Sequence, residues 1–201
     1  MRIIAGQLGG RKLISPPSDA TRPITDRAKQ SLFDILAPTI EGSLVYDCFA
    51  GTGSLGLESL SRGAKFVTFF EADRPTVARL NQNVMALKLS ERCRIVQGDL
   101  FKWFQLSITR PGSTDATGAD IVFVDPPYRF LTQHSDELLQ LSLHLTHAHV
   151  KPESIVVFRH DGKNELELPN LSRFDLREYG DMTIEFLHPA SKSEGGGESQ
   201  P

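Results

Sequence analysis

The sequence is poor in cysteine and in long apolar runs. Only two of its 201 residues are cysteines, Cys48 and Cys93, and their spacing matches neither a metal site nor a redox pair. Both fall in or beside expected strands, so we expect buried, reduced thiols in a cytoplasmic protein. No apolar run reaches the length of a membrane-spanning helix, and the N-terminus lacks the apolar core of a signal peptide. The length suits a single domain with a sizeable core.

The sequence also lacks a complete set of metal ligands. His144, His147 and His149 lie close together in the sequence. No cysteine or further histidine pair completes a zinc set around them. We therefore expect no bound metal.

Positive charge is scarce overall, since the net charge is −3, but it is concentrated near the N-terminus. Residues 1–31 carry six basic and two acidic side chains, a net charge of +4 that leaves −7 for the rest. A basic segment on an acidic body suggests a face for phosphates, and a solvated surface without a partner is the alternative. The candidate RNA contacts are Arg11, Lys12, Arg22, Arg27 and Lys29.

The most informative residues are Asp125-Pro126-Pro127-Tyr128. They follow residues 121–124, an apolar run typical of a buried parallel strand, so they lie where open α/β sheets bind ligands. Since proline donates no backbone hydrogen bond, the carbonyls of Asp125 and Pro126 have no competing donor beside them. Together with the carboxylate and the ring, they predict an acceptor-rich pocket for a flat amine such as a nucleobase. A simple strand end with a core tyrosine is the alternative.

A strand, a glycine turn and a helix are expected between residues 44 and 63. Gly51, Gly53 and Gly56 fit the G-x-G-x-x-G pattern of dinucleotide-binding proteins. Glu71 ends the next expected strand, where an acid that binds a ribose belongs. This pattern alone suits a NAD-dependent oxidoreductase equally well.

Two further acids bear on the choice of cofactor. Asp47 precedes Gly51 by four residues, where its charge would oppose the pyrophosphate of a dinucleotide. It would instead attract the ammonium and sulfonium of S-adenosylmethionine, so it favours that cofactor over NAD. Asp99 follows another short expected strand and can accept a hydrogen bond from an adenine amine, with Leu100 or Phe101 against the ring. An N-cap is the alternative role of Asp99, and the two roles are compatible.

These motifs, in this order, resemble a class I S-adenosylmethionine-dependent methyltransferase, in a variant that methylates exocyclic amines of bases. The segments 1–6, 10–13 and 21–29 are similar to the RsmD family, bacterial methyltransferases of guanine N2 in small-subunit ribosomal RNA. The resemblance covers roughly residues 1–188. The chain departs from the family pattern at Ile24, near Arg159-His160, and in residues 109–118, which we expect to form a loop insertion.

The resemblance implies methyl transfer to the N2 amine of a guanine in 16S ribosomal RNA. Implied partners are that RNA or the assembling 30S subunit, with the protein acting as a monomer away from membranes. The implied cofactor contacts are Asp47, Phe49, Gly51, Gly53, Glu71, Asp99 and Leu100, and the implied catalytic residues are Asp125, Pro126, Pro127 and Tyr128. The alternatives are a DNA adenine-N6 or other amino-methyltransferase, a NAD-dependent oxidoreductase, and a non-catalytic RNA-binding protein.

Alternating strand and helix patterns from Leu44 to about Arg159 predict an α/β fold with a parallel sheet. The resemblance implies a class I methyltransferase Rossmann-like sheet of seven strands, helices on both faces, and one antiparallel strand from a C-terminal hairpin. We expect a β-hairpin around Gly9-Gly10, a helix from Thr25 or Asp26 to Leu36 that Pro38 stops, and a C-terminal hairpin turning at Gly180-Asp181. The expected parts are an N-terminal hairpin and helix extension (1–40), the methyltransferase core (41–189) and a disordered tail (190–201).

Overall fold

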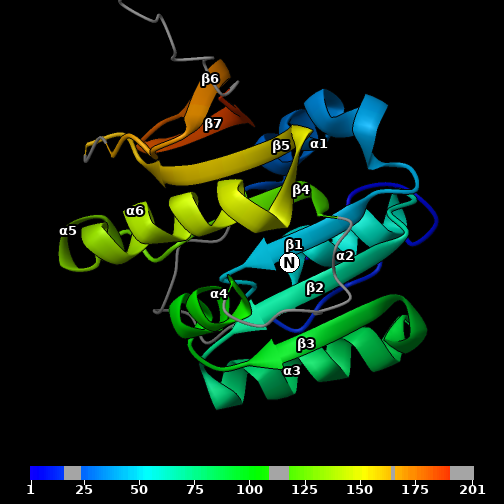
Figure 1. Cartoon of the computed structure of the whole chain (residues 1–201). Helices are drawn as coiled ribbons and strands as arrows, with labels where there is room; N and C mark the ends of the chain where they lie inside the picture. The colour runs from blue at the N-terminus through cyan, green and yellow to red at the C-terminus, as the bar shows by residue number, and fades with distance from the viewer. Residues whose placement is uncertain (16–23, 109–117, 164–165, 191–201) are drawn as a thin grey trace, which may run out of the picture.

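A seven-stranded sheet forms the centre of the molecule. The computed structural model describes residues 1–15, 24–108, 118–163 and 166–190. The strands are β1 (Leu44–Cys48), β2 (Phe66–Glu71), β3 (Cys93–Gln97), β4 (Ala119–Val124), β5 (Val150–Asp161), β6 (Leu171–Tyr179) and β7 (Met182–Pro189). Their order is β3-β2-β1-β4-β5-β7-β6 (Figure 1). Strand β7 is antiparallel to both of its neighbours, β5 and β6, and the pairs among β1 to β5 are parallel, which confirms the predicted topology.

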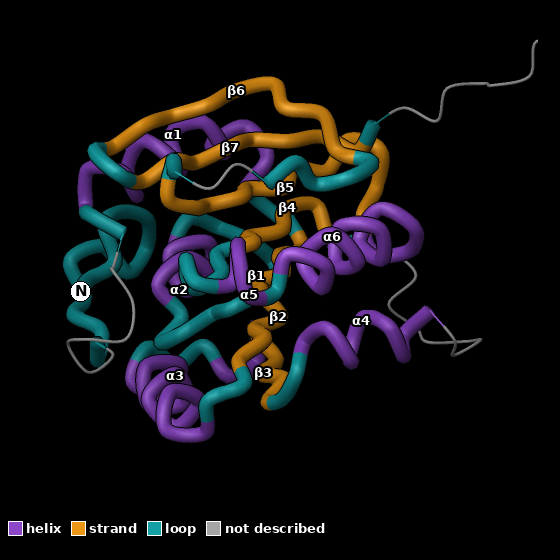
Figure 2. Tube along the Cα trace, turned by 90° about the vertical axis from the view of Figure 1, so that its left-hand side faces the viewer, coloured by secondary structure: helices purple, strands orange, loops and turns teal. Residues whose placement is uncertain are grey.

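Helices cover both faces of the sheet. They are α1 (Asp26–Ile40), α2 (Ser54–Ser61), α3 (Arg74–Ala86), α4 (Leu100–Ile108), α5 (Phe130–Gln133) and α6 (Ser135–His144). Helices α1, α2 and α3 lie on one face, and α4 and α6 lie on the other (Figure 2). In β4, Ile121 and Phe123 pack toward the first face, whereas Val122 and Val124 pack toward the second. This alternation follows from the two-residue period of a strand and makes both faces apolar.

Helix α1 begins as the sequence predicts but ends later. The Thr25 side chain accepts a hydrogen bond from the Ala28 amide at 3.2 Å, so Thr25 is the N-cap. The prediction that Pro38 stops the helix is wrong, because α1 continues to Ile40 with Pro38 inside it. Ile40 is 5% exposed and belongs to the core cluster, so burial of the last turn offsets the hydrogen bond that proline cannot donate.

The N-terminal segment is less regular than the predicted hairpin. One isolated antiparallel bridge joins Arg2 to Lys12, and the Ile3 amide donates to the Arg11 carbonyl at 2.9 Å. Gly6 has a φ of +80°, and a Cβ there would lie 2.0 Å from the Ser61 carbonyl oxygen. The segment therefore folds tightly against α2, because its glycine lets the two backbones approach closely.

The C-terminal hairpin is present, with Tyr179 paired to Met182 across the predicted turn. The predicted tail and loop insertion lie outside the described residues, except for Ala190 and Gly118. None of the helices that the structure describes is both long and apolar enough to span a membrane.

Candidate active site

Four acidic residues gather at one edge of the sheet. Strands β1, β2, β3 and β4 are parallel, so their carboxyl ends meet at the edge that faces the viewer in Figure 2. Asp47 is the last residue but one of β1, and Glu71 is the last residue of β2. Asp99 is the second residue after β3, and Asp125 is the first after β4. The edge on which the sequence places a ligand therefore carries all four predicted acids.

Asp47 is buried behind the glycine turn. Its Oδ2 accepts a hydrogen bond from the Gly56 amide at 2.9 Å, and the residue is 1% exposed. Burial raises the pKa of Asp47 to about 7, against the lowering effect of the Gly56 hydrogen bond. Asp47 thus fastens the first turn of α2 to the end of β1. Its contact with a methionine amine stays a prediction.

Glu71 joins two glycine turns. Its Oε2 accepts from the Gly51 amide at 2.9 Å, and its backbone carbonyl accepts from the Gly98 amide at 3.0 Å. Gly51 and Gly98 have φ values of +57° and +144°, and a Cβ at either would meet nothing within 4 Å. The backbone is therefore open on the side where a side chain would stand, which suits close approach of a ligand. The predicted contact of Glu71 with a ribose stays a prediction.

Phe49 has an unusual backbone and a central ring. Its φ is +70°, a left-handed value that a side chain rarely adopts. The ring lies 5.9 Å, between centroids, from Phe101 at the start of α4 and equally far from Phe130 at the start of α5. The ring of Phe49 therefore lies between Phe101, which is expected near the adenine, and Phe130, which follows Asp125-Pro126-Pro127-Tyr128 in the sequence. That Phe49 contacts the cofactor stays a prediction.

Asp99 serves as the N-cap of α4. Its Oδ1 accepts hydrogen bonds from the Phe101 amide at 3.0 Å and the Lys102 amide at 3.3 Å. The capping role considered from the sequence is thus confirmed. The Asp99 side chain is 45% exposed, so it stays reachable for an adenine amine, and Leu100 beside it is buried. The adenine contact of both residues remains a prediction.

Asp125 is paired with a buried arginine. Its Oδ1 lies 2.5 Å from the Nε of Arg159, and the two side chains are 15% and 9% exposed. Burial raises the pKa of Asp125, and the Arg159 guanidinium opposes that rise by its charge and its hydrogen bond. Pro126 is buried beside them, and the hydroxyl oxygen of Tyr128 is also buried.

Sequence reasoning missed this partner of Asp125. Arg159 attracted notice only as a departure from the family pattern. In the sheet, the last residue of β4, Val124, pairs with Phe158 of β5, so Asp125 and Arg159, which follow them, are neighbours. The available signal was a lone arginine directly after the apolar run 155–158, although the strand itself continues to Asp161.

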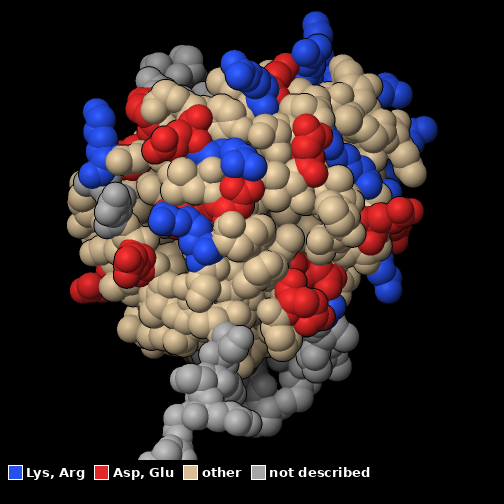
Figure 3. Space-filling model, turned by 90° about the horizontal axis from the view of Figure 1, so that it is seen from above, with Lys and Arg blue, Asp and Glu red and all other residues tan. Residues whose placement is uncertain are grey.

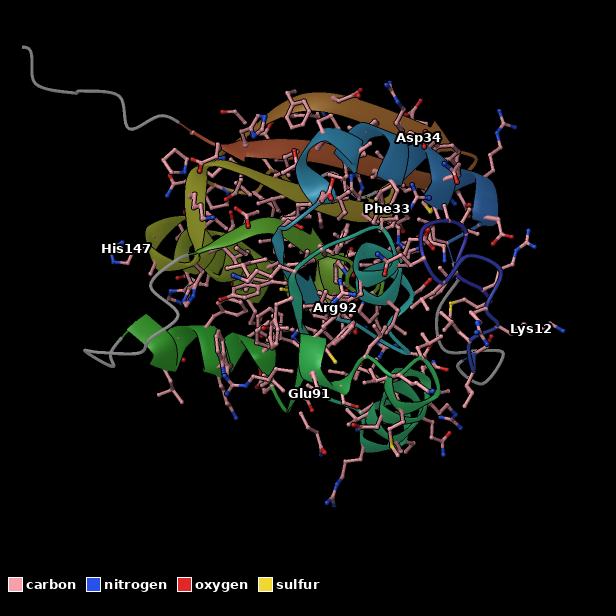
Figure 4. All side chains as sticks on the ribbon, turned by 90° about the vertical axis from the view of Figure 1, so that its right-hand side faces the viewer. Lys12, Phe33, Asp34, Glu91, Arg92 and His147 are labelled. Atoms are coloured by element: carbon pink, nitrogen blue, oxygen red, sulfur yellow. The ribbon has the colours of Figure 1, made fainter. Side chains whose placement is uncertain are left out.

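The basic residues predicted to bind RNA do not share one environment. Arg11, Lys12 and Arg27 are exposed, and Lys12 extends away from the body of the protein (Figure 4). Arg22 lies outside the described residues. The predicted RNA contact of Lys29 is wrong, because Lys29 is 1% exposed and its Nζ donates to the Arg2 carbonyl at 2.6 Å.

Lys29 instead belongs to a buried cluster around Glu58, which the sequence did not single out. The Glu58 carboxylate accepts from the Ile4 amide at 2.7 Å, the Ala5 amide at 3.0 Å and Arg62 Nε at 2.8 Å. The Lys29 ammonium lies 3.5 Å from it. Glu58 therefore anchors the N-terminal segment to α2. A single acid within the apolar run 55–60 was the signal for such a role.

Asn83 forms a second anchor between the N-terminal segment and the glycine turn. Its Oδ1 accepts from the Ile14 amide at 2.8 Å, and its Nδ2 donates to the Thr52 carbonyl at 3.0 Å. No group of three histidine, cysteine, aspartate or glutamate side chains among the described residues is arranged to hold a metal.

Comparison with known proteins places the chain in a family. It is 43% identical over 129 residues to "Ribosomal RNA small subunit methyltransferase D" of Escherichia coli strain K12, covering 64% of this chain and 61% of that protein. It is 31% identical over 171 residues to "Putative rRNA methyltransferase YlbH" of Bacillus subtilis strain 168, covering 84% and 86%. Matches to the first curated relatives thus span less than two thirds of their length.

A solved structure extends the similarity over almost the whole chain. "Putative methyltransferase yhhF from Escherichia coli" superposes with a TM-score of 0.78 at 32% identity, covering 94% of this chain and 98% of that one. The fold is therefore that of the class I methyltransferases, as the sequence predicted. The model of the family described as "Conserved hypothetical protein 95" matches residues 1–188. The chain belongs to this family, which is the RsmD family.

Proposed function

We propose that the protein transfers a methyl group from S-adenosylmethionine to the N2 amine of a guanine in small-subunit ribosomal RNA. The carrying observation is that the acceptor-rich Asp125-Pro126 pair adjoins the glycine turn. Asp125 follows β4, and its amide lies 3.5 Å from the carbonyl of Cys48, the last residue of β1. An amine held at Asp125 would therefore be next to a cofactor held over Gly51. The Escherichia coli relative named "Ribosomal RNA small subunit methyltransferase D" supports the coarser part of this proposal, methyl transfer to small-subunit ribosomal RNA.

The chain's own residues would act chiefly by positioning. The guanine amine is a weak nucleophile, because its lone pair is delocalised into the ring. Hydrogen bonds to the Asp125 carboxylate and the Pro126 carbonyl would turn that lone pair toward the cofactor. When bound, S-adenosylmethionine supplies an electrophilic methyl group, whose carbon–sulfur bond breaks as a carbon–nitrogen bond to the base forms. The ring of Tyr128 would stack on the extruded base.

The RNA would approach through the exposed basic residues of the N-terminal segment, Arg11 and Lys12, together with Arg27. The face over β6, β7 and α1 is less suited to a polyanion, because acidic and basic side chains are interspersed on it (Figure 3). The relevant contacts are with phosphates, which position an RNA without reading its sequence.

One experiment tests the proposed activity. The protein is incubated with methyl-labelled S-adenosylmethionine and either deproteinised RNA or small subunits from a strain that lacks the enzyme. We expect label in a guanine nucleoside methylated at N2. Label in adenine would favour the adenine-N6 alternative, and tighter binding of NAD than of S-adenosylmethionine in calorimetry would favour an oxidoreductase.

The matched variants are Asp125→Ala and Glu91→Ala. Asp125→Ala should reduce turnover by about a hundredfold or more while cofactor affinity stays close to wild type, since one positioned polar contact is worth about 2.7–4 kcal/mol in a barrier. Glu91 is exposed and precedes β3 at the opposite edge of the sheet (Figure 4), so its variant should resemble the wild type. If Asp125→Ala turned over at the wild-type rate, Asp125 would not be a catalytic residue.

A further inference from the structure

Asp125 and Arg159 form a short and largely buried ion pair at the proposed substrate site. The Nε of Arg159 points at Oδ1 of Asp125 over 2.5 Å, and both side chains are largely buried. Arg159 is held in turn by Met182 of β7, whose sulfur lies 3.6 Å from Nη1. A guanidinium fixed in this way presents its donors in one geometry. Because Arg159 binds Oδ1 of Asp125, Oδ2 is the oxygen that can accept a hydrogen bond from the substrate.

Two further titratable groups act on this pair. They are Asp47 from β1 and Tyr128 from the segment after β4, and Glu71 from β2 acts in turn on Asp47. Arg159 is the cation of the pair, and the other groups named here are acids. It opposes the rise in the pKa of Asp125 that burial causes, and it acts in the same direction on Asp47. Loss of Arg159 would thus leave buried carboxylates without their counter-charge.

We infer that Arg159 is a positioning residue that binds Oδ1 of Asp125 and turns its Oδ2 toward the substrate amine. This inference rests on the proposed function and deepens it. A carboxylate that is bound to a buried guanidinium is a good acceptor and a poor base. Asp125 therefore accepts a hydrogen bond from the amine, and the proton that the nitrogen sheds after methyl transfer passes to water.

An asparagine at position 125 tests this role of Arg159. In Asp125→Asn, Arg159 would attract the amide oxygen and turn the amide nitrogen toward the substrate. Two donors would then face each other, and the amine would not be held. If Arg159 is also replaced by methionine, the amide can reverse and present its oxygen. Asp125→Asn should therefore be nearly inactive, and the double variant Asp125→Asn/Arg159→Met should recover activity.

The first test measures kcat at a saturating concentration of the cofactor. If the loss of Arg159 also affects Asp47 and so the cofactor affinity, that effect changes the KM for the cofactor and not kcat. We expect the double variant to exceed Asp125→Asn by about tenfold, which is one hydrogen bond of about 1.4 kcal/mol. Equal inactivity of the two, with cofactor binding intact, would mean that Asp125 acts as a base and would overturn the inference.

The second test needs no activity, so it separates this inference from the proposed function. The Asp125 carboxyl is titrated by nuclear magnetic resonance with isotope-labelled aspartate, using Asp125→Asn for assignment. The pKa of Asp125 should be higher in Arg159→Met than in wild type, closer to wild type in Arg159→Lys, and unchanged in Arg94→Met, an exposed arginine of β3. The pH profile of turnover in Arg159→Met should move to higher pH in parallel. An unchanged titration would overturn the inference, whereas absence of RNA methylation by the wild type would count against the proposed function alone.

Discussion

The Gly56 amide donates a hydrogen bond of 2.9 Å to a carboxylate, Asp47, that is almost completely buried. Burial outweighs this single donor, and the pKa of Asp47 is raised to about 7. Near neutral pH the group therefore exists in both charge states. The cofactor proposed for this site carries positive charge, so its binding and the ionisation of Asp47 should be coupled.

The first prediction is that affinity for S-adenosylmethionine falls as pH drops below about 7. A cation favours the ionised carboxylate, so binding weakens where Asp47 is protonated, by at most about tenfold per pH unit, and levels off above pH 7. Calorimetry across this range, in buffers of different protonation enthalpy, measures both the affinity and the proton released. In Asp47→Asn the dependence should vanish. An affinity for the wild type that is constant from about pH 5.5 to 8 would contradict this coupling.

The second prediction concerns stability. The folded-state pKa of Asp47 lies above the unfolded one, so the unfolded chain loses its proton first and the free energy of unfolding decreases as pH rises from about 4 to 7. Asp47→Asn removes this penalty. The ligand-free variant should be more stable than the wild type at pH 8, by up to about 4 kcal/mol, and should gain nothing near pH 3.5. Denaturant titrations at the two pH values measure the difference, and an equal effect at both would exclude ionisation as its cause.

The third prediction separates two roles of Glu71. Glu71→Ala removes the acceptor for the Gly51 amide and should weaken cofactor binding by about 1–3 kcal/mol, the range for leaving a polar group unpaired. Glu71→Gln keeps an acceptor for Gly51 and should lose less. Calorimetry of both variants gives the comparison, with Asp175→Ala on β6 as a control away from this edge. Equal losses in the two Glu71 variants would show that the charge matters and that the hydrogen bond to Gly51 does not.

The fourth prediction concerns the buried Glu58 cluster. Glu58→Ala leaves Lys29 buried without its counter-charge and the Ile4 and Ala5 amides without their acceptor. It should cost about 3–5 kcal/mol of the free energy of unfolding. Hydrogen exchange should show the loss of protection at these two amides first. Glu178→Ala, an exposed glutamate of β6, should change stability by less than about 0.5 kcal/mol. A similar small change for Glu58→Ala would mean that the N-terminal segment is held by its apolar contacts alone.

The sequence predicted the elements that depend on local pattern. Apolar β-branched runs identified β4, the Thr25 cap marked the start of α1, and the C-terminal turn located the one antiparallel strand. The four acids were also placed correctly at one edge, because parallel strands deliver their carboxyl ends there. Each of these inferences needs only a short stretch of chain and a rule about its geometry.

Contacts between distant residues could not be predicted in the same way. Asp125 and Arg159 are 34 positions apart and meet only because β4 and β5 pair in one register. Lysine is a residue type that usually lies at the surface, yet the N-terminal segment covers Lys29 and buries it beside Glu58. Pro38 lies within a helix because tertiary packing outweighed a local preference. In each case the deciding interaction came from a partner that the local sequence does not reveal.

The last prediction concerns the exposed basic residues of the N-terminal segment. Arg2 pairs with Asp26 at 2.9 Å, so Arg11 and Lys12 are the exposed basic side chains of residues 1–15 that remain for a phosphate. Each phosphate contact releases condensed counterions, so RNA affinity should fall with salt by a log–log slope of about −0.7 per contact on single strands. Replacing Arg11 and Lys12 together by alanine should weaken RNA binding, reduce the magnitude of that slope by about 1.4, and leave cofactor affinity unchanged.

The control is a double alanine variant of Lys65 and Lys88, two exposed lysines at the amino-terminal edge of the sheet. This variant should keep the wild-type slope. Superimposable salt titrations for the wild type and the Arg11/Lys12 variant would show that this segment is a solvated surface, and Arg27 would become the first residue to test in its place.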